Sequence, residues 1–207
     1  MLEVSSQSPP AKPFPLAAAA TPPAPVQITV NGFVVRTLVP ADVTPRFAEW
    51  INSPAMRAGL NLPNLGFDET RLRQFIAGFD GRRNHIIGIF DKALLIGFYT
   101  IDVNLTHKVG SITAGIGEVG KGRRKVYWRT IDALLDHFFT YRDLDKMVAH
   151  ILAGNTAMLF NFVDSSRFLH EARLRKECLG QDGRRQDLMV FAAFRDGERP
   201  KGVSYQP

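Results

Sequence analysis

The sequence predicts a mixed α/β domain with a central, mostly antiparallel sheet and helices on both of its faces. Three consecutive stretches, residues 85–90, 93–103 and 109–116, are rich in β-branched and aromatic residues and are separated by short polar breaks, as antiparallel strands are. The spacing of the apolar residues then changes: between 131 and 139 it is that of an amphipathic helix. Strands and helices that follow one another in this way typically form a sheet covered by helices.

A hairpin and two helices are expected before these strands. Asn31-Gly32 separates two short apolar runs and readily adopts the positive φ angles of a type I′ turn. Thr44-Pro45 combines an N-cap with proline at the first helical position, and therefore predicts the start of a helix. Asp68 can cap a second helix, whose apolar residues recur at i, i+3, i+4 and i+7.

Four more elements are expected after the long helix. A short strand covers residues 146–152, and Asn155 can cap the helix that follows it. Two closing strands, about 168–178 and 186–194, flank a turn at Asp182-Gly183. The expected order is one or two strands, two helices, three strands, a helix, a strand, a helix and two strands.

Length and composition indicate one domain. The chain has 207 residues, of which 45% are hydrophobic and 22% charged, enough to bury a core. We expect residues 1–25 to be a disordered Pro/Ala-rich arm, 26–198 the folded domain and 199–207 a flexible tail. The apolar stretches fall short of the roughly 20 residues that cross a bilayer. The single cysteine, Cys178, excludes an internal disulfide and predicts a cytoplasmic location.

The positive charge is unevenly distributed. The formal net charge is +6, and basic residues gather between Lys121 and Arg129 and again between Arg173 and Arg185. This distribution favours an anionic ligand or partner, although a solvated basic surface explains the second cluster equally well.

A glycine-rich and basic segment separates the third strand from the long helix. It reads Gly-Ile-Gly-Glu-Val-Gly-Lys-Gly-Arg-Arg-Lys-Val from Gly115 onwards. Unpaired backbone amides and the helix dipole make such a helix start a site for phosphate. Three motifs fit the segment: a dinucleotide fingerprint, a P-loop, and the pyrophosphate loop of a coenzyme A site.

The first two motifs fit the segment poorly. The spacing Gly115-x-Gly117-x-x-Gly120 matches a dinucleotide fingerprint, but charged residues intervene before the helix and the preceding strands look antiparallel rather than part of a βαβ unit. A P-loop needs Ser or Thr where this chain has Gly122. The coenzyme A loop therefore remains the preferred interpretation.

Several stretches along the chain resemble one enzyme family. They are Val35 to Leu38 before Asp42, Trp50 to Pro54, Ile116-Gly117-Glu118, the helix around Ala133 to Phe139, Ile151 to Leu159, and Asp182 to Phe194. Together they are similar to the landmarks of GNAT N-acetyltransferases of the ribosomal-protein branch. The resemblance covers about Phe33 to Asp196 and consists of many weak matches.

The resemblance implies the GNAT fold and an acyltransferase. Such an enzyme transfers an acetyl or other acyl group from coenzyme A to a primary amine, by direct attack in a ternary complex. Its sheet is expected to splay between the strands that end near Ile116 and Leu152, with pantetheine inserted between them like a missing strand. The family often forms homodimers, and the segment from Asn52 to Phe67 would wall the acceptor site.

The resemblance also assigns the cofactor residues. Backbone groups of Gly115, Ile116 and Gly117 would bind the pantetheine arm and polarise the thioester, and Asn155 would lie beside that arm. The pyrophosphate would be held by the loop and first helical turn, namely Gly122, Arg123, Arg124, Lys125, Val126 and Tyr127.

Two departures from the family pattern affect this assignment. Lys125 and Tyr127 stand where the family's loop has glycines, so the backbone approaches a phosphate less easily, although Arg123, Arg124 and Lys125 can compensate with charge-assisted hydrogen bonds. Many members also have a tyrosine seven residues after the asparagine, which protonates the departing thiolate; here that position is Phe162. A degenerate protein that binds acyl-CoA without turnover is therefore the alternative function.

Glu118 and His150 are the candidates for a general base. An α-amino group has a pKa near 8 and needs little help to lose its proton, whereas a lysine amine near 10.4 needs more. No metal site is predicted, because the histidines lack ligand spacing and there is one cysteine. A nucleic-acid-binding module is a further alternative, but the chain has no recognised motif of that kind.

The acceptor cannot be identified from the sequence. The residues that we expect to contact it, by resemblance, are Met56, Arg57, Leu60, Asn61 and Leu62. The phenylalanines on the amphipathic helices are predicted to be core residues because of their helical spacing.

Overall fold

The computed structural model describes residues 24–117, 125–163 and 165–197, which form one eight-stranded sheet in the order β1-β2-β3-β4-β5-β6-β8-β7. The strands are β1 (Gln27–Val30), β2 (Phe33–Thr37), β3 (Asn84–Asp91), β4 (Leu94–Asn104), β5 (Val109–Ile116), β6 (Lys146–Leu152), β7 (Leu169–Leu179) and β8 (Arg185–Phe194). Within this part of the chain β5 and β6 pair in parallel and the other neighbours pair antiparallel. The predicted mixed, mostly antiparallel sheet is confirmed.

Several predictions concern residues outside the described ranges. The predicted arm, apart from residues 24 and 25, and the tail of residues 199–207 lie there, as do Glu118, Gly122, Arg123 and Arg124. In the ranges that are described, no helix has the length and apolar character needed to cross a membrane.

The predicted turn and caps are found where the sequence placed them. Asn31 and Gly32 have φ angles of 50° and 83°, as a type I′ hairpin between β1 and β2 requires. The Thr44 hydroxyl accepts a hydrogen bond of 3.2 Å from the Phe47 N–H, and the Asp68 carboxylate one of 2.7 Å from the Arg71 N–H. These side chains satisfy backbone donors that the first helical turn leaves free.

The prediction of two helices before β3 was wrong, because the described chain has three α-helices and a short 3-10 helix there. These are η1 (Pro40–Asp42), α1 (Pro45–Ile51), α2 (Pro54–Leu60) and α3 (Glu69–Ala77). The missed helix is α2, in which Ser53 accepts a hydrogen bond of 3.3 Å from the Met56 N–H and thereby repeats the capping pattern of α1. Met56 is its one buried residue, so α2 has no apolar period that could be detected.

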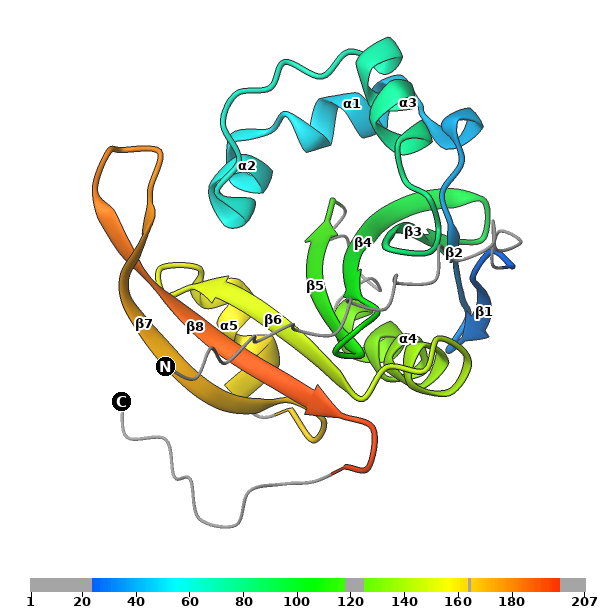
Figure 1. The fold of residues 1–207 in the computed structure, drawn as a ribbon. Helices are drawn as coiled ribbons and strands as arrows, with labels where there is room; N and C mark the ends of the chain where they lie inside the picture. Colours follow the sequence, from blue (N-terminus) through cyan, green and yellow to red (C-terminus); the bar gives the residue numbers. More distant parts are fainter. Residues whose placement is uncertain (1–23, 118–124, 164, 198–207) are drawn as a thin grey trace, which may run out of the picture.

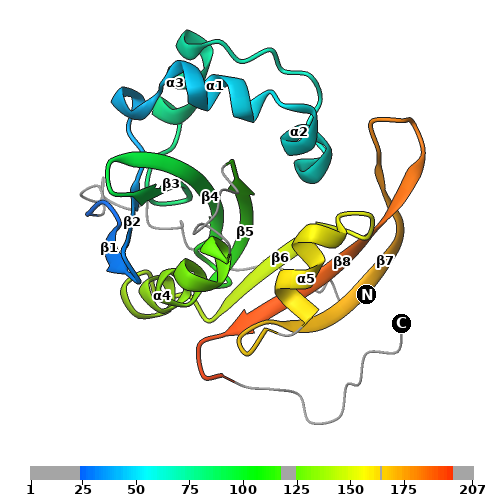
Figure 2. The ribbon, with the colours of Figure 1, turned by 180° about the vertical axis from the view of Figure 1, so that it is seen from behind.

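The remaining helices are α4 (Val126–Tyr141) and α5 (Thr156–Val163), and the helices divide between the two faces of the sheet. One apolar cluster joins α1 and α3 to β3 and β4, whereas the larger cluster joins α4 and Phe162 of α5 to the opposite face. Figures 1 and 2 show α1 to α3 as a layer on one side and α4 and α5 on the other. The two halves of the sheet, β1 to β5 and β6 to β8, diverge beneath α2.

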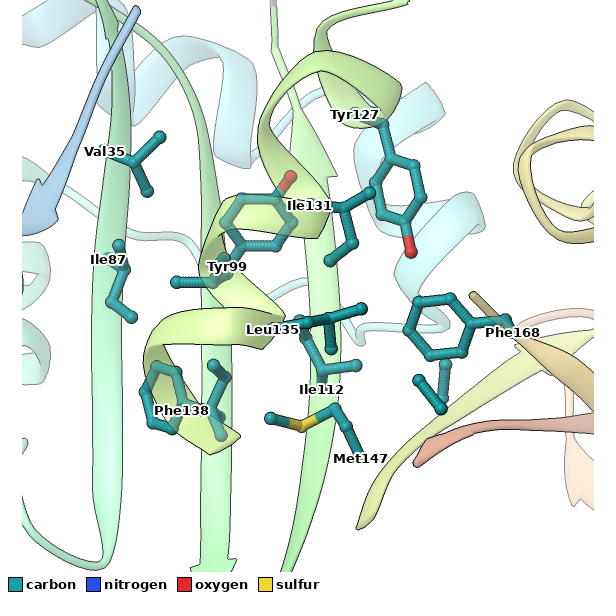
Figure 3. Close-up of a cluster of buried hydrophobic side chains, with 14 of the residues drawn as sticks. Val35, Ile87, Tyr99, Ile112, Tyr127, Ile131, Leu135, Phe138, Met147 and Phe168 are labelled. Carbon is teal, nitrogen blue, oxygen red and sulfur yellow. The ribbon is translucent and has the colours of Figure 1, made fainter. Parts of the chain in front are cut away.

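The core under α4 positions the strands that matter for the site. Ile131, Leu135 and Phe138 of α4 face Ile87, Ile112 and Met147 from three strands (Figure 3). Beside them the hydroxyls of Tyr99 and Thr130 share a buried hydrogen bond of 2.7 Å. Burial of these apolar side chains, each about 1.5–3 kcal/mol, fixes α4 across β3 to β6.

The helix phenylalanines are core residues with two exceptions. Phe138, Phe139 and Phe162 are buried as predicted, but Phe75 is 45% exposed and Phe160 71% exposed. Phe75 instead packs against its neighbour Phe79, with ring centroids 5.2 Å apart, at the outer side of α3.

Candidate functional site

The sheet opens between β5 and β6, as expected. The parallel pairing begins at Val109 with Lys146 and ends at Ile112 with Ala149. Beyond that point β5 continues its ladder with β4, and β6 continues its ladder with β8. The two strands therefore separate along their carboxyl-terminal halves and leave one edge of each unpaired.

A cleft of about 490 Å³ occupies this opening. Its walls come from α1 and α2, from the end of β5, from the first turn of α4 and from α5. The lining residues are Trp50, Ser53, Ala55, Met56, Gly59, Leu60, Ala114, Gly115, Ile116, Gly117, Lys125, Val126, Tyr127, Asn155, Ala157, Met158 and Asn161. A smaller pocket adjoins it and is lined by, among others, Thr113, Tyr127, His150 and Phe162. Most of the described cofactor candidates are thus brought together.

The hydrogen-bond register shows which backbone groups face the opening. The Gly117 N–H donates to the Ile96 carbonyl at 3.0 Å, so Gly117 points its backbone groups toward β4. Because these directions alternate along an antiparallel strand, Gly115 also faces β4, whereas Ala114 and Ile116 face the open edge. Of the three residues predicted for backbone contacts, Ile116 directs its backbone groups to the open edge, whereas Gly115 and Gly117 direct theirs to β4. Ala114, which the sequence analysis did not single out, also faces the open edge.

Gly115 and Gly117 have a packing role instead. A Cβ atom at Gly115 would lie 2.5 Å from the Phe98 ring, and one at Gly117 would lie 2.3 Å from the Trp50 indole. Both distances are far below van der Waals contact. The absence of side chains here allows Trp50 and Phe98, stacked with centroids 6.0 Å apart, to lie against the end of β5.

One reason for rejecting the dinucleotide fingerprint was wrong. β5, α4 and β6 do form a βαβ unit, since α4 connects two parallel strands. The motif still does not apply, because Gly117 directly follows β5 and its N–H already donates to the Ile96 carbonyl, which leaves no free N–H at that position for a phosphate.

The start of α4 provides a site for an anion. Lys125 is the N-cap residue, has a φ angle of 68° and makes no capping hydrogen bond with its side chain. The first N–H groups of the helix are therefore free of a side-chain cap, and the exposed Lys125 adds a positive charge beside them. A left-handed conformation is the one that glycine adopts without strain, which agrees with the alignment of Lys125 to a family glycine.

Asn155 holds two helices together at the edge of the cleft. Its Oδ1 accepts a hydrogen bond of 3.1 Å from the Met158 N–H and caps α5, as predicted. Its Nδ2 donates to the Gly59 carbonyl at 3.0 Å. The side chain is thus engaged by protein on both atoms, so its contribution is to tie α2 to α5.

His150 lies on the α2 side of the opening. Met147, Ala149 and Ile151 are buried in the core beneath α4, so the alternation of β6 directs His150 to the other face, where its side chain is exposed. It lines the smaller pocket. Among the described lining residues no carboxylate occurs, and Glu118 lies outside the described ranges.

The predicted acceptor residues divide into two groups. Met56 and Leu60 line the cleft. Arg57, Asn61 and Leu62 do not, because they bind the hairpin between β7 and β8. Asn61 Nδ2 donates to the Leu179 carbonyl at 3.1 Å, and Gln181 Nε2 donates to the carbonyls of Arg57 and Leu62 at 2.9 and 2.6 Å.

The side chain of Tyr127 is the feature that sequence reasoning missed. It lies in the first turn of α4, as predicted, but points inward and is 4% exposed. Its hydroxyl has no hydrogen-bond partner among the described residues, and burial raises its pKa well above the ordinary value. The aromatic residue at a glycine position was the signal that could have identified it.

Comparison with known proteins supports the fold. No family model matches the sequence, and a search of curated proteins gave no match. Among solved structures, the chain is similar to the RimL ribosomal L7/L12 α-N-protein acetyltransferase in complex with coenzyme A, with a TM-score of 0.72 and 17% identity over 84% of this chain and 100% of that one. A spermidine N-acetyltransferase from Vibrio cholerae, in complex with coenzyme A and spermine, gives 0.68 and 20% over 80% and 97%.

A third structure agrees with these two. The ribosomal-protein-S5-alanine acetyltransferase from Vibrio fischeri has a TM-score of 0.68 and 14% identity over 84% of this chain and 100% of that one. The similarity to all three structures extends over at least 80% of this chain and nearly all of each of them. The chain therefore has the fold of these N-acetyltransferases, which is the GNAT fold that the sequence analysis expected.

Proposed function

We propose that the protein is an acyl-CoA-dependent N-acyltransferase that transfers an acetyl group to a primary amine. The observation that carries the proposal is the junction of an unpaired strand edge with an uncapped helix start in one cleft. A strand edge binds an extended chain with amides, and a helix start binds phosphate. Coenzyme A combines both groups, a pantetheine arm and a pyrophosphate.

The described residues fit this cofactor. Backbone groups of Ala114 and Ile116 would pair with the pantetheine amides, and the α4 amides with Lys125 would hold the pyrophosphate. Two buried donors of the cleft, the Trp50 indole N–H and the Tyr127 hydroxyl, have no partner among the described residues, which is unfavourable unless a ligand supplies one.

The cofactor would supply the thioester, and the chain would supply orientation and proton transfer. The chain would hold a neutral amine against the thioester carbonyl, and a backbone N–H at the open edge of β5 would be placed to donate a hydrogen bond to the carbonyl oxygen. His150 is our candidate to accept the amine proton, directly or through water, because it borders the opening on the α2 side. Glu118, the first candidate from the sequence, lies outside the described residues and remains a candidate for the same role.

We propose an α-amino group as the acceptor rather than a polyamine. The described lining of the cleft contains Lys125 and no carboxylate that could bind a chain of positive charges. An α-amine is also partly neutral at pH 7. RimL, by its name, acetylates the α-amine of a ribosomal protein, and the spermidine N-acetyltransferase acts on a polyamine.

Thiol release from acetyl-CoA tests this function. We expect a peptide with a free amino terminus to release thiol faster than spermidine, by about tenfold or more, with mass spectrometry showing acetylation at the α-amine. Coenzyme A binding without thiol release from any amine would instead support the degenerate, non-catalytic alternative, for which the apolar Phe162 is the motivating observation.

A cytoplasmic location and a homodimer complete the proposal. Both derive from the sequence and the family resemblance. Light scattering of the purified protein measures the oligomeric state directly, and a monomer at working concentration would contradict the dimer.

A further inference from the structure

In many members of the resembled family a tyrosine protonates the departing thiolate, and this chain has Phe162 at that position. Phe162 is 4% exposed and packs among Tyr127, Phe168 and Phe191, with ring centroids 4.8 to 5.3 Å away. It has no polar atom to offer a thiolate. If the protein is the acyltransferase proposed above, another group near Phe162 is needed to stabilise the thiolate.

Tyr127 is the aromatic neighbour of Phe162 on the cleft side. The two ring centroids lie 5.3 Å apart, and both residues line the pocket at the bottom of the opening. Figure 3 shows the Tyr127 ring projecting from the first turn of α4, with its hydroxyl directed away from the helix on the side of Phe168. A phenol is therefore present beside the position at which many family members have their tyrosine.

The hydroxyl of Tyr127 is an unsatisfied hydrogen-bond donor in the described part of the chain. It is buried, and no described residue forms a hydrogen bond with it. The neighbouring Tyr99 differs, because its hydroxyl is bonded to Thr130 at 2.7 Å. An unpaired buried hydroxyl destabilises the ligand-free fold, so its presence at a cleft indicates that it acts on something that enters the cleft.

We propose that Tyr127 is the catalytic residue that donates a hydrogen bond to the departing thiolate. The amine nitrogen forms a bond to the carbonyl carbon, and the bond between that carbon and sulfur breaks with its electron pair on sulfur. The Tyr127 hydroxyl keeps its proton and donates its hydrogen bond to that sulfur, and the thiolate takes a proton from solvent. The amine loses its own proton to the general base, so charge and atoms balance.

The test uses coenzyme A itself, because its free thiol reports on the proposed contact without any acceptor. Ultraviolet absorbance of the thiolate gives the pKa of the thiol when coenzyme A is bound. We expect that pKa to be about one unit higher in Tyr127→Phe than in the wild type, since the donor that stabilises the thiolate is lost. With acetyl-CoA and an accepted amine, kcat should fall about 100-fold with little change in KM.

Two variants separate this role from packing. Tyr99→Phe removes a buried phenol that does not line the cleft, so it should lower the melting temperature and leave the thiol pKa unchanged. Tyr127→Phe should not lower the melting temperature, because the lost hydroxyl has no hydrogen-bond partner in the part of the chain that the structure describes. Adding Phe162→Tyr to Tyr127→Phe should restore part of kcat by supplying a phenol at the family position.

The outcomes distinguish this inference from the function on which it rests. An unchanged thiol pKa and kcat in Tyr127→Phe, with coenzyme A still bound, would overturn the role of Tyr127 alone. Failure of the wild type to bind coenzyme A would overturn the proposed function and the inference together. A raised thiol pKa with a reduced kcat supports both.

Discussion

Gly117→Ala is expected to destabilise the fold by about 3 kcal/mol, the upper part of the range for overpacking. The added methyl group would lie 2.3 to 2.7 Å from three atoms of the Trp50 indole, which is a rigid ring. Trp50 cannot retreat easily, because it packs on Phe47 and Phe98 with centroids 4.7 and 6.0 Å away. Urea denaturation should show a lower midpoint with an unchanged slope.

Gly154→Ala is the matched control for this substitution. Its methyl group would meet only a Gln186 side-chain oxygen at 3.8 Å, so we expect a change within about 0.5 kcal/mol. In a Trp50→Leu background, Gly117→Ala should cost less, because the smaller side chain leaves room for the methyl group. Equal effects of the two alanines in the wild type would contradict the packing role of Gly117.

Lowering the pH from 6.5 to 4 is expected to remove about 3 kcal/mol of stability through His85. Burial is the main cause that lowers the pKa of this histidine from 6.5 to about 4, and the nearby Arg142 adds to it. Below pH 6.5 the unfolded chain takes up a proton at His85 that the folded chain does not bind until about pH 4. Stability is therefore complete above pH 6.5 and falls through this window.

His85→Leu checks the assignment of this pH dependence. His85 packs edge-on against Phe138 at 5.0 Å, and its Nε2 has no partner among the described residues. Leucine can therefore take its place in the core, at the loss of the hydrogen bond between His85 and the Arg82 backbone. The variant should lose most of the change in unfolding free energy between pH 6.5 and 4. Carboxylates whose pKa is lowered in the fold, such as Asp42 beside Arg36, reduce stability only at lower pH, below 3.8. If the unfolding free energy of His85→Leu depended on pH as strongly as that of the wild type, the account would be contradicted.

Much of the fold follows from local chemistry and could be predicted. The Asn31-Gly32 turn and the caps at Thr44, Asp68 and Asn155 depend on residues adjacent in sequence. The strands depend on β-branched runs, and β5 and β6 were predicted with their observed ends. α2 escaped notice because it buries only one side chain of its own.

The site depends on long-range contacts that the sequence does not contain. The direction of the Gly117 N–H depends on its register with Ile96, and the need for glycine there depends on Trp50, which is distant in sequence. The inward position of Tyr127 depends on how α4 lies over β5 and β6. The resemblance placed Asn155 at the cleft correctly but not its bond to Gly59.

Calorimetric titration with coenzyme A is the most direct test of the central claim, that the opening between β5 and β6 holds this cofactor. Ala157 is exposed and lines the cleft, whereas Phe160 is exposed on the same helix and does not line it. We expect Ala157→Trp to weaken binding about tenfold or more by filling the cleft, and Phe160→Trp to bind as the wild type does. Equal binding by all three proteins, or no binding by the wild type, would contradict the claim.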